Sequence, residues 1–255
     1  MIRDRKKTVC IVTGGCCEDE FVYDYINNIK PELTIAVDSG MDFFLRTKTK
    51  PDKVMGDFDS ISDEAWGYLG LDRTENFKPE TGCDTGDCGR IDSNGLALDS
   101  RYIRYNINGV DVISYDVDRK LYTDTETAIR RAITEGAESI HILAGTGGRL
   151  DQFFGILQSM AIALKNRVEC VLVDRTNRIR LIDGDFSIKK AGQFGHYVSL
   201  VPFSGEIKGI ELKGFKYDVS DFSLSPVGAG GISNEIAEEE AFISFEGGLL
   251  IVIES

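Results

Sequence analysis

Apolar residues follow two different periods along the chain, and the change from one to the other lies near residue 175. Before that point, short runs rich in β-branched residues alternate with stretches in which apolar residues recur every three to four positions. The first pattern is typical of buried strands and the second of amphipathic helices. Expected strands cover residues 8–13, 33–37, 110–117, 139–144 and 168–173, and expected helices cover residues 18–30, 123–135 and 150–165. Strands that alternate with helices predict a mostly parallel sheet with helices on both faces.

After residue 175 the pattern is one of short strands separated by Asp-Gly, Ser-Gly and Gly-Gly pairs, which are typical of hairpin turns. The expected strands cover residues 178–182, 185–191, 196–203, 206–212, 240–247 and 249–254. Such a series predicts an antiparallel sandwich or barrel. The fold class we predict is therefore a mostly parallel, Rossmann-like α/β domain over residues 1–175, followed by an antiparallel β-sandwich domain over residues 176–255.

One segment of the first domain fits neither pattern. Residues 78–109 are rich in Gly, Asp and Ser, and a structureless loop of that length is uncommon inside a compact domain. We interpret the segment as an insertion, with an inserted hairpin as one form that it could take, and its role is left open.

Length, composition and charge narrow the class of protein. A chain of 255 residues, 42% of them hydrophobic, can bury a core of ordinary size. No apolar run approaches the roughly 20 residues of a membrane span, and the N-terminus lacks the apolar stretch of a signal peptide. We therefore expect a soluble cytoplasmic protein with no membrane partner. The net charge of -13 also disfavours a nucleic-acid partner, because that affinity comes mainly from Lys and Arg at phosphates.

Cysteine and histidine spacing argues against a structural zinc site. The six cysteines form no CxxC pair, and the chain has only two histidines. Cys10 and Cys170 lie in apolar, strand-like runs and are predicted to be small core residues.

Two aspartates in the sequence VMGDFDSIS, residues 54–62, are the first candidates for chemistry. Asp57 and Asp59 follow a strand-like run, and the carboxyl ends of strands are where open α/β sheets bind their ligands. Alternate residues of an extended backbone face the same way, so both carboxylates would project together while Phe58 packs on the other side. A metal site and a polar Asx-type turn are both open interpretations of this pair.

A capping box marks the start of one expected helix. In TDTE, residues 123–126, the Thr123 hydroxyl can accept a hydrogen bond from the Glu126 amide, and Glu126 can reach back to the Thr123 amide. Asp124 would then lie in the first helical turn, at the carboxyl end of the preceding strand. Its position is explained either by the helix dipole or by a bound ligand.

A glycine-rich turn, GTGGRLDQ at residues 145–152, lies between an expected strand and an expected helix. Glycines let the backbone approach a phosphate, and free amides at a helix N-terminus favour an anion. The turn lacks the GK[ST] ending of a Walker A loop, and a purely structural turn is an alternative. Arg149 and Asp151 add a phosphate partner and a possible base to it, and Asp38 also follows an expected strand and precedes a glycine.

Four strand ends thus each bring a carboxylate or a glycine loop to one edge of the predicted sheet. Carboxylates hold hard cations such as Mg2+, and glycine loops hold phosphates. Together they predict magnesium-assisted phosphoryl chemistry.

In their order and approximate spacing, these motifs resemble those of the thiamine pyrophosphokinase family. The matching motifs, which span most of the chain, are DSG (38–40), GDFDS (56–60), TD (123–124), GTGGRLDQ (145–152) and SNE (233–235). The resemblance implies an α/β catalytic domain, a thiamine-binding β-sandwich, and a homodimer with sites at the subunit interface. It also implies a Mg2+-dependent reaction in which the pyrophosphoryl group of ATP passes to the hydroxyl of thiamine, giving thiamine diphosphate and AMP.

The resemblance implies a role for each matching residue. Asp57, Asp59 and Asp124 would hold Mg2+ bridging the ATP phosphates, with Asp38 nearby in support. Asp151 would orient or deprotonate the thiamine hydroxyl. The remaining implied contacts are those of Thr123, Gly145, Thr146, Gly147, Gly148 and Arg149 with phosphates, of Gln152 in assisting Asp151, and of Ser233 and Asn234 with the pyrimidine ring.

This sequence also departs from the family pattern. Leu121 follows Lys120 where the family usually has an acidic residue, and the only tryptophan, Trp66, lies in the first domain. The aromatic residue that stacks on thiamine is therefore not identified, although a Phe or Tyr face would suit the thiazolium cation. Two alternatives are a pyrophosphokinase for another primary alcohol, such as a pterin, and a non-catalytic module that binds thiamine phosphates.

Overall fold

The computed structural model describes residues 6–70, 102–115 and 122–255, which divide into two compact units, Met1–Glu169 and Cys170–Ser255. We refer to them as the first and the second unit. None of the helices in the described ranges combines the length and the apolar character needed to cross a bilayer.

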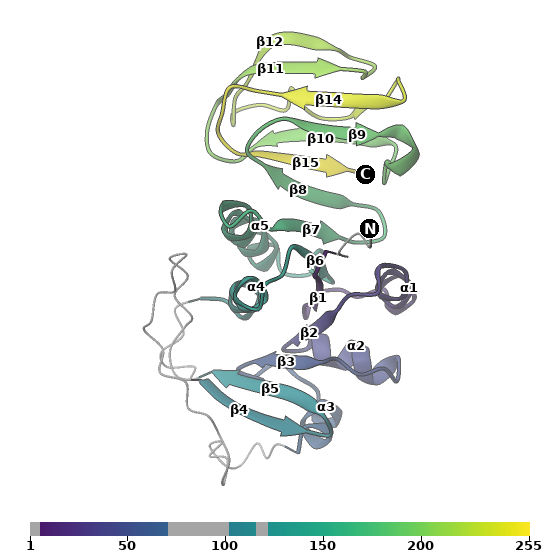
Figure 1. Cartoon of the computed structure of the whole chain (residues 1–255), viewed down its shortest axis with the longest axis vertical. Coiled ribbons are helices and arrows are strands. Elements are labelled where there is room, and N and C mark those ends of the chain that lie inside the picture. The colour runs from purple at the N-terminus through teal and green to yellow at the C-terminus, as the bar shows by residue number, and fades with distance from the viewer. Residues whose placement is uncertain (1–5, 71–101, 116–121) are drawn as a thin grey trace, which may run out of the picture. The chain divides into compact units, whose positions relative to one another are not determined.

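The first unit is a mixed α/β structure built on strands in the order β6-β1-β2-β3-β5-β4 (Figure 1). Neighbouring strands from β6 to β5 pair in parallel, and β4 pairs with β5 antiparallel. The strands are β1 (Thr8–Val12), β2 (Leu33–Val37), β3 (Lys53–Gly56), β4 (Tyr102–Ile107), β5 (Val110–Tyr115) and β6 (Ser139–Leu143). The helices are α1 (Asp19–Ile29), α2 (Gly40–Arg46), α3 (Asp63–Tyr68), α4 (Asp124–Thr134) and α5 (Leu150–Lys165).

The order of these strands reverses at β1. From β1 the chain runs through α1 and α2 to β2 and β3, and α4 later returns it to β6 on the other side of β1. Because such crossovers are right-handed, the outward and returning helices cover opposite faces: α1 and α2 lie on one side, α4 and α5 on the other (Figure 1). Open sheets bind ligands at such a reversal, beyond the carboxyl ends of the strands.

The longer helices begin and end close to their predicted positions. The Thr123 hydroxyl accepts a hydrogen bond from the Glu126 amide at 3.2 Å and so caps α4. The carboxylate of Glu126 accepts hydrogen bonds from Arg130, one turn further along the helix. The predicted helices 123–135 and 150–165 are therefore confirmed. The short helices α2 and α3 were not predicted, because seven and six residues are too few to show a helical period.

The second unit is an antiparallel, sandwich-like structure. One layer has the strand order β7-β8-β15-β10-β13 and the other has the order β12-β11-β14-β9. Within the described residues of this unit, these strands pair with one another antiparallel. The strands are β7 (Glu169–Val173), β8 (Arg178–Ile182), β9 (Phe186–Lys189), β10 (Tyr197–Pro202), β11 (Ile207–Lys213), β12 (Val219–Leu224), β13 (Asn234–Glu235), β14 (Glu240–Ser244) and β15 (Leu250–Glu254).

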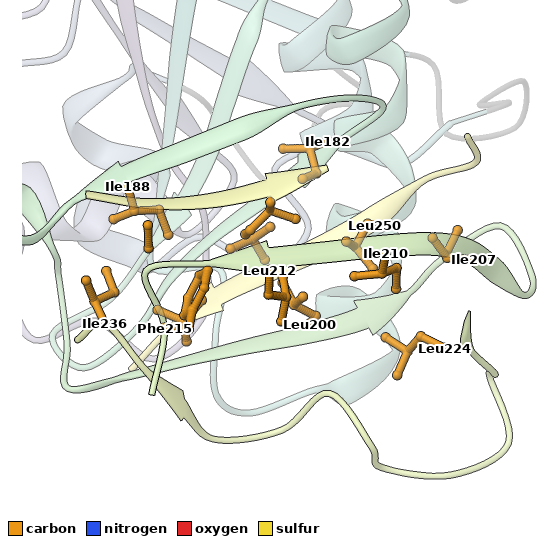
Figure 2. Close-up of a cluster of buried hydrophobic side chains, with 14 residues drawn as sticks. Ile182, Ile188, Leu200, Ile207, Ile210, Leu212, Phe215, Leu224, Ile236 and Leu250 are labelled. Atoms are coloured by element: carbon orange, nitrogen blue, oxygen red, sulfur yellow. The ribbon is translucent and has the colours of Figure 1, made fainter. Parts of the chain in front are cut away.

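Apolar side chains from both layers form the core of the second unit. Figure 2 shows Leu200 and Leu250 from one layer among Ile188 and Leu212 from the other. All four are at most 7% exposed. The predicted antiparallel sandwich is confirmed in this form, with β12 and β13 as additional strands.

Further predictions concern two cysteines, the domain limits and the insertion. Cys10 and Cys170 are buried, as predicted. The units divide at residues 169 and 170, whereas the predicted domain limits, 1–175 and 176–255, stay a prediction. Of the predicted insertion, residues 78–101 lie outside the described residues, as do Lys120 and Leu121, whereas residues 102–109 form β4 and its turn into β5.

Each unit contains a buried ionic cluster. In the first unit, Lys53 donates to Asp111 at 2.8 Å and lies 3.3 Å from the Glu135 carboxylate. Burial alone would raise the pKa of Asp111, but hydrogen bonds from Arg104 and Lys53 outweigh it and hold this pKa below its usual value.

In the second unit, the carboxylate of Glu254 is fully buried. It accepts hydrogen bonds from Arg178 at 2.6 and 2.7 Å, from Arg180 at 2.6 Å and from the Phe194 amide at 3.1 Å. A charge buried this deeply is tolerated because it is paired and its lone pairs are filled.

Candidate active site

A cleft of about 520 Å³ lies at the carboxyl ends of β1, β2, β3 and β6. Its walls are the turns that follow these strands and the first residues of α4 and α5. The predicted site residues that line it are Asp38, Asp57, Asp59, Asp124, Gly145, Gly147, Gly148, Arg149 and Gln152. The remaining predicted residues of this unit, Thr123, Thr146 and Asp151, are next to lining residues in the sequence.

Three carboxylates converge in this cleft. Asp38, Asp57 and Asp124 each offer one oxygen, and these oxygens lie within 4.8 Å of one another. Asp124 is only 9% exposed. Carboxylate oxygens at such separations fit a small hard cation, which prefers oxygen ligands. Asp59, also predicted to be a ligand, lines the cleft but is not one of the three.

The backbone around Asp38 explains why it joins the cluster. Asp38 has a left-handed φ of 45°, and its amide donates to the Met55 carbonyl at 3.0 Å. Its Oδ1 accepts a hydrogen bond from the Phe58 amide at 3.3 Å. Phe58 is also left-handed, with φ of 62°, so the extended backbone expected between Asp57 and Asp59 is wrong. Phe58 is nevertheless only 2% exposed and packs inward as predicted. Strained residues of this kind cluster at functional sites.

Gly56 leaves the space that the Asp38 carboxylate occupies. A Cβ on Gly56 would lie 1.8 Å from Asp38 Oδ1, and the φ of Gly56 is +153°. Asp57 and Asp59 follow this glycine, and the Asp59 amide donates to Asp57 Oδ1 at 3.2 Å. Because Gly56 of the GDFDS motif has no side chain, the Asp38 carboxylate at the end of β2 can lie against the end of β3.

The glycine-rich turn after β6 lines the same cleft. Ala144 has φ of 55°, and Gly147 and Gly148 have φ of +79° and +77°. Only glycine adopts that conformation without strain, and the turn leads directly into the N-terminus of α5. Backbone amides at a helix N-terminus favour an anionic ligand.

Arg149 and Asp151 form an exposed ion pair at this helix start. Arg149 donates to the two oxygens of Asp151 at 2.6 and 3.2 Å, and the side chains are 73% and 64% exposed. The hydrogen bond from Arg149 holds the pKa of Asp151 below its usual value. Asp151 is therefore charged near neutral pH and is a weak proton acceptor.

The turn after β1 was missed from the sequence. Thr13, Gly14, Gly15 and Cys16 line the cleft. The Thr13 hydroxyl donates to the Ala144 carbonyl at 2.6 Å, and a Cβ on Gly15 would lie 2.2 Å from that same oxygen. The signal was the sequence TGG directly after a strand, which repeats the TGG of the turn after β6.

A second pocket, of about 240 Å³, lies in the second unit. It contains the predicted residues Ser233 and Asn234, and its walls are mainly apolar. Three aromatic residues line it, namely Phe215, Tyr217 and Phe222, and Tyr217 is 60% exposed. An apolar pocket with a few polar groups at one side suits a small aromatic ligand.

The side chain of Asn234 is engaged within the protein. Its Oδ1 accepts hydrogen bonds from the amides of Tyr217 at 3.1 Å and Glu235 at 2.9 Å, and its Nδ2 donates to the Tyr217 carbonyl at 2.9 Å. Ser233, with a left-handed φ of 62°, donates its amide to the Ser199 hydroxyl at 3.0 Å.

Comparisons with known proteins match both units. A family model described as "Thiamin pyrophosphokinase, catalytic domain" matches residues 26–172, and one described as "Thiamin pyrophosphokinase, vitamin B1 binding domain" matches residues 185–250. The thiamine pyrophosphokinase of Bacillus subtilis (strain 168) is 27% identical over 259 residues, covering 98% of this chain and 99% of the relative.

Solved structures are also similar. The crystal structure of thiamine pyrophosphokinase from Bacillus subtilis gives a TM-score of 0.73 at 26% identity and covers 98% of this chain and 99% of that chain. Thiamin pyrophosphokinase from Candida albicans gives a TM-score of 0.69 at 17% identity and covers 98% and 89% of the two chains. At 17% identity the second likeness concerns the fold alone.

Proposed function

The chain belongs to the thiamine pyrophosphokinase family and is an enzyme of this type, and we propose that its reaction depends on Mg2+ and takes place in the cleft of the first unit. The family implies ATP as the co-substrate. In the proposed reaction the hydroxyl oxygen of thiamine attacks the β-phosphorus of ATP. The bond from that phosphorus to the α–β bridging oxygen breaks, AMP leaves with the bonding electrons, and the hydroxyl proton is released.

One observation carries this assignment of the site. Three carboxylates from separate parts of the chain meet within 4.8 Å, in a cleft that is also lined by a glycine turn leading into a helix N-terminus. A cluster of negative charge beside an anion-binding turn is expected where a cation and phosphates bind together.

The donor set fits Mg2+. Asp57 and Asp124 are the proposed ligands from the sequence, and the geometry supports Asp38 as a third ligand rather than a neighbour in support. Asp59 remains a proposed ligand, acting from the same wall of the cleft. When bound, Mg2+ would neutralise phosphate charge and polarise the phosphoryl oxygens.

The glycine turn and Arg149 would bind and orient the phosphates. Gly145, Gly147 and Gly148 line the cleft, so their backbone amides are the proposed phosphate donors, and the exposed Arg149 guanidinium can donate to a phosphate without losing its link to Asp151. Thr123 and Thr146 are proposed as further donors at the edges of this wall. Most of the rate enhancement would then come from positioning and charge neutralisation.

Asp151 is proposed to orient the thiamine hydroxyl with help from Gln152, which lies in the first turn of α5 and lines the cleft. Its pKa is held below the usual value by Arg149, so Asp151 would accept a hydrogen bond far more readily than a proton. An orienting role is thus better supported than deprotonation.

The pocket of the second unit is the proposed thiamine site. Its apolar walls suit the rings, Ser233 is one of its few polar lining residues, and Tyr217 offers the most exposed aromatic face. The thiazolium ring is a cation, and an aromatic face stabilises a cation by about 0.5–2 kcal/mol. Tyr217 is therefore our candidate for the aromatic residue that the sequence did not identify.

Three finer assignments also belong to the proposal. The first domain, residues 1–175, is taken as a mostly parallel, Rossmann-like catalytic domain, which its four parallel strand pairings support, and residues 176–255 as the thiamine-binding domain. A homodimer with its sites at the subunit interface and a cytoplasmic location rest on the family resemblance. Sedimentation of the purified protein tests whether it is a homodimer.

The direct test is to incubate the purified protein with ATP, Mg2+ and thiamine and to quantify AMP. We expect AMP formation that requires both thiamine and Mg2+, with thiamine diphosphate in equal amount. Replacing thiamine with a hydroxymethylpterin is the matched control. AMP formed only with the pterin, or thiamine binding without AMP, would contradict the proposal.

A further inference from the structure

We propose that Asn234 is a positioning residue, which acts on the substrate through Tyr217. Its side-chain amide fixes the backbone from which the Tyr217 ring projects at the pocket. This inference rests on the proposed function, since it takes the pocket of the second unit as the thiamine site. The resemblance implies a direct contact between Asn234 and the pyrimidine ring instead, and the experiments below distinguish the two roles.

The hydrogen bonds of Asn234 use most of its capacity. A side-chain amide has two acceptor positions and two N–H donors. Both acceptor positions are filled, by the amides of Tyr217 and Glu235, and one N–H is donated to the Tyr217 carbonyl. A substrate group that needs an acceptor finds none on this side chain.

Strand pairing explains why a side chain, rather than the backbone, makes these hydrogen bonds to Tyr217. The backbone of Asn234 belongs to β13, which pairs with β10 through Val198. On its other side, Phe215 pairs with Ile236, and the Lys216 amide donates to the Glu235 carbonyl at 2.8 Å. In this register the next residue, Tyr217, lies opposite Asn234, and the amide side chain extends the pairing by one residue.

Figure 2 shows where this extension begins. Phe215 and Ile236 lie side by side in the core, and both are at most 5% exposed. Tyr217, two residues further along, is 60% exposed, so packing contributes little to its placement. Two hydrogen bonds to its own amide and carbonyl groups therefore fix the peptide units from which the ring projects.

A double-mutant cycle distinguishes positioning from direct contact. At saturating ATP and Mg2+, we expect Asn234→Ala to raise the KM for thiamine about fivefold and Tyr217→Ala about tenfold, the range of one aromatic contact. If Asn234 acts only through the ring, the double variant resembles Tyr217→Ala, at about tenfold rather than the fiftyfold of independent effects. The KM for ATP should stay unchanged in all three. Independent effects of the two substitutions would overturn the proposal.

Asn234→Ser gives the same cycle if Asn234→Ala fails to fold, because serine stays polar but is too short to bridge both Tyr217 groups. Asn177→Ala is the matched control. Asn177 also uses its side-chain amide within the protein, donating to both carboxylate oxygens of Asp174 in the turn between β7 and β8, and it does not line the pocket. It should leave the KM for thiamine unchanged.

A second readout does not depend on thiamine. With 3-fluorotyrosine incorporated, the resonance of residue 217 is assigned by its loss in Tyr217→Phe. We expect it to shift or broaden in Asn234→Ser and to stay in place in Asn177→Ala. An unchanged resonance in Asn234→Ser would overturn the positioning role, whereas a wild-type protein that forms no thiamine-dependent AMP would overturn the proposed function alone.

Discussion

Replacing Gly56 by alanine tests whether the carboxylate cluster depends on a missing side chain. The added Cβ would lie 1.8 Å from Asp38 Oδ1 and 2.7 Å from its Cγ. Since Cβ atoms in proteins essentially never approach such neighbours closer than 3.0 Å, the oxygen must move by about 1.2 Å. Asp38 would then leave the cluster with Asp57 and Asp124.

A displacement of this size has a predictable kinetic effect. Misplacing a catalytic group by about 1 Å can cost roughly 100-fold in rate, which corresponds to about 2.7 kcal/mol. We therefore expect kcat/KM for thiamine-dependent AMP formation to fall about 100-fold in Gly56→Ala. Half-maximal activity should also require more Mg2+, because one of three ligands is displaced.

Gly136→Ala is the matched control for backbone strain. Gly136 has φ of +83°, and no atom lies within 4 Å of the Cβ that would be added. Both substitutions should destabilise the fold by about 1–3 kcal/mol in urea denaturation, but only Gly56→Ala should change kinetics. Activity and Mg2+ dependence of Gly56→Ala within twofold of wild type would show that the carboxylate cluster does not depend on the missing side chain.

Three further predictions concern the buried ionic clusters. Lys53→Met removes one partner of a pair whose side chains are 10% and 16% exposed, and should lower the free energy of unfolding in urea by about 3 kcal/mol; no loss would mean that Asp111 needs no such partner. Glu254→Gln removes the buried charge to which Arg178 and Arg180 donate and should destabilise the protein by about 3–4 kcal/mol, seen as a lower Tm, and an unchanged Tm would contradict this. Because the pKa of Asp111 is lower in the folded than in the unfolded chain, its stabilising contribution is present above the unfolded pKa and is lost as pH falls through the folded pKa. Unfolding free energies measured from pH 7 to pH 3 should therefore fall less steeply in Asp111→Asn than in wild type.

The parts of the fold that the sequence predicts are those with a local cause. Helix α4 begins where Thr123 caps it, and α5 begins after two left-handed glycines, so both helix starts can be recognised from a few consecutive residues. Buried strands such as β1 are visible as short apolar runs. The order of strands is not local, but alternating strands and helices leave few arrangements open.

The parts that the sequence could not give depend on contacts across the fold. Asp38 reaches the cluster because its left-handed backbone and the empty space at Gly56 turn its carboxylate toward Asp57. The role of Asn234 depends on its register with Tyr217, 17 residues earlier in the chain. Neither relation has a spacing that a motif could encode.

Binding of Mn2+, as a paramagnetic substitute for Mg2+, tests whether Asp38, Asp57 and Asp124 form one divalent-cation site. Free Mn2+ is followed by electron paramagnetic resonance as wild type and single Asp→Asn variants are titrated. We expect one site per chain, weakened at least about tenfold by substitution of each of the three, with Asp151→Asn as the unaffected control. Wild-type affinity in Asp57→Asn and Asp124→Asn would contradict it.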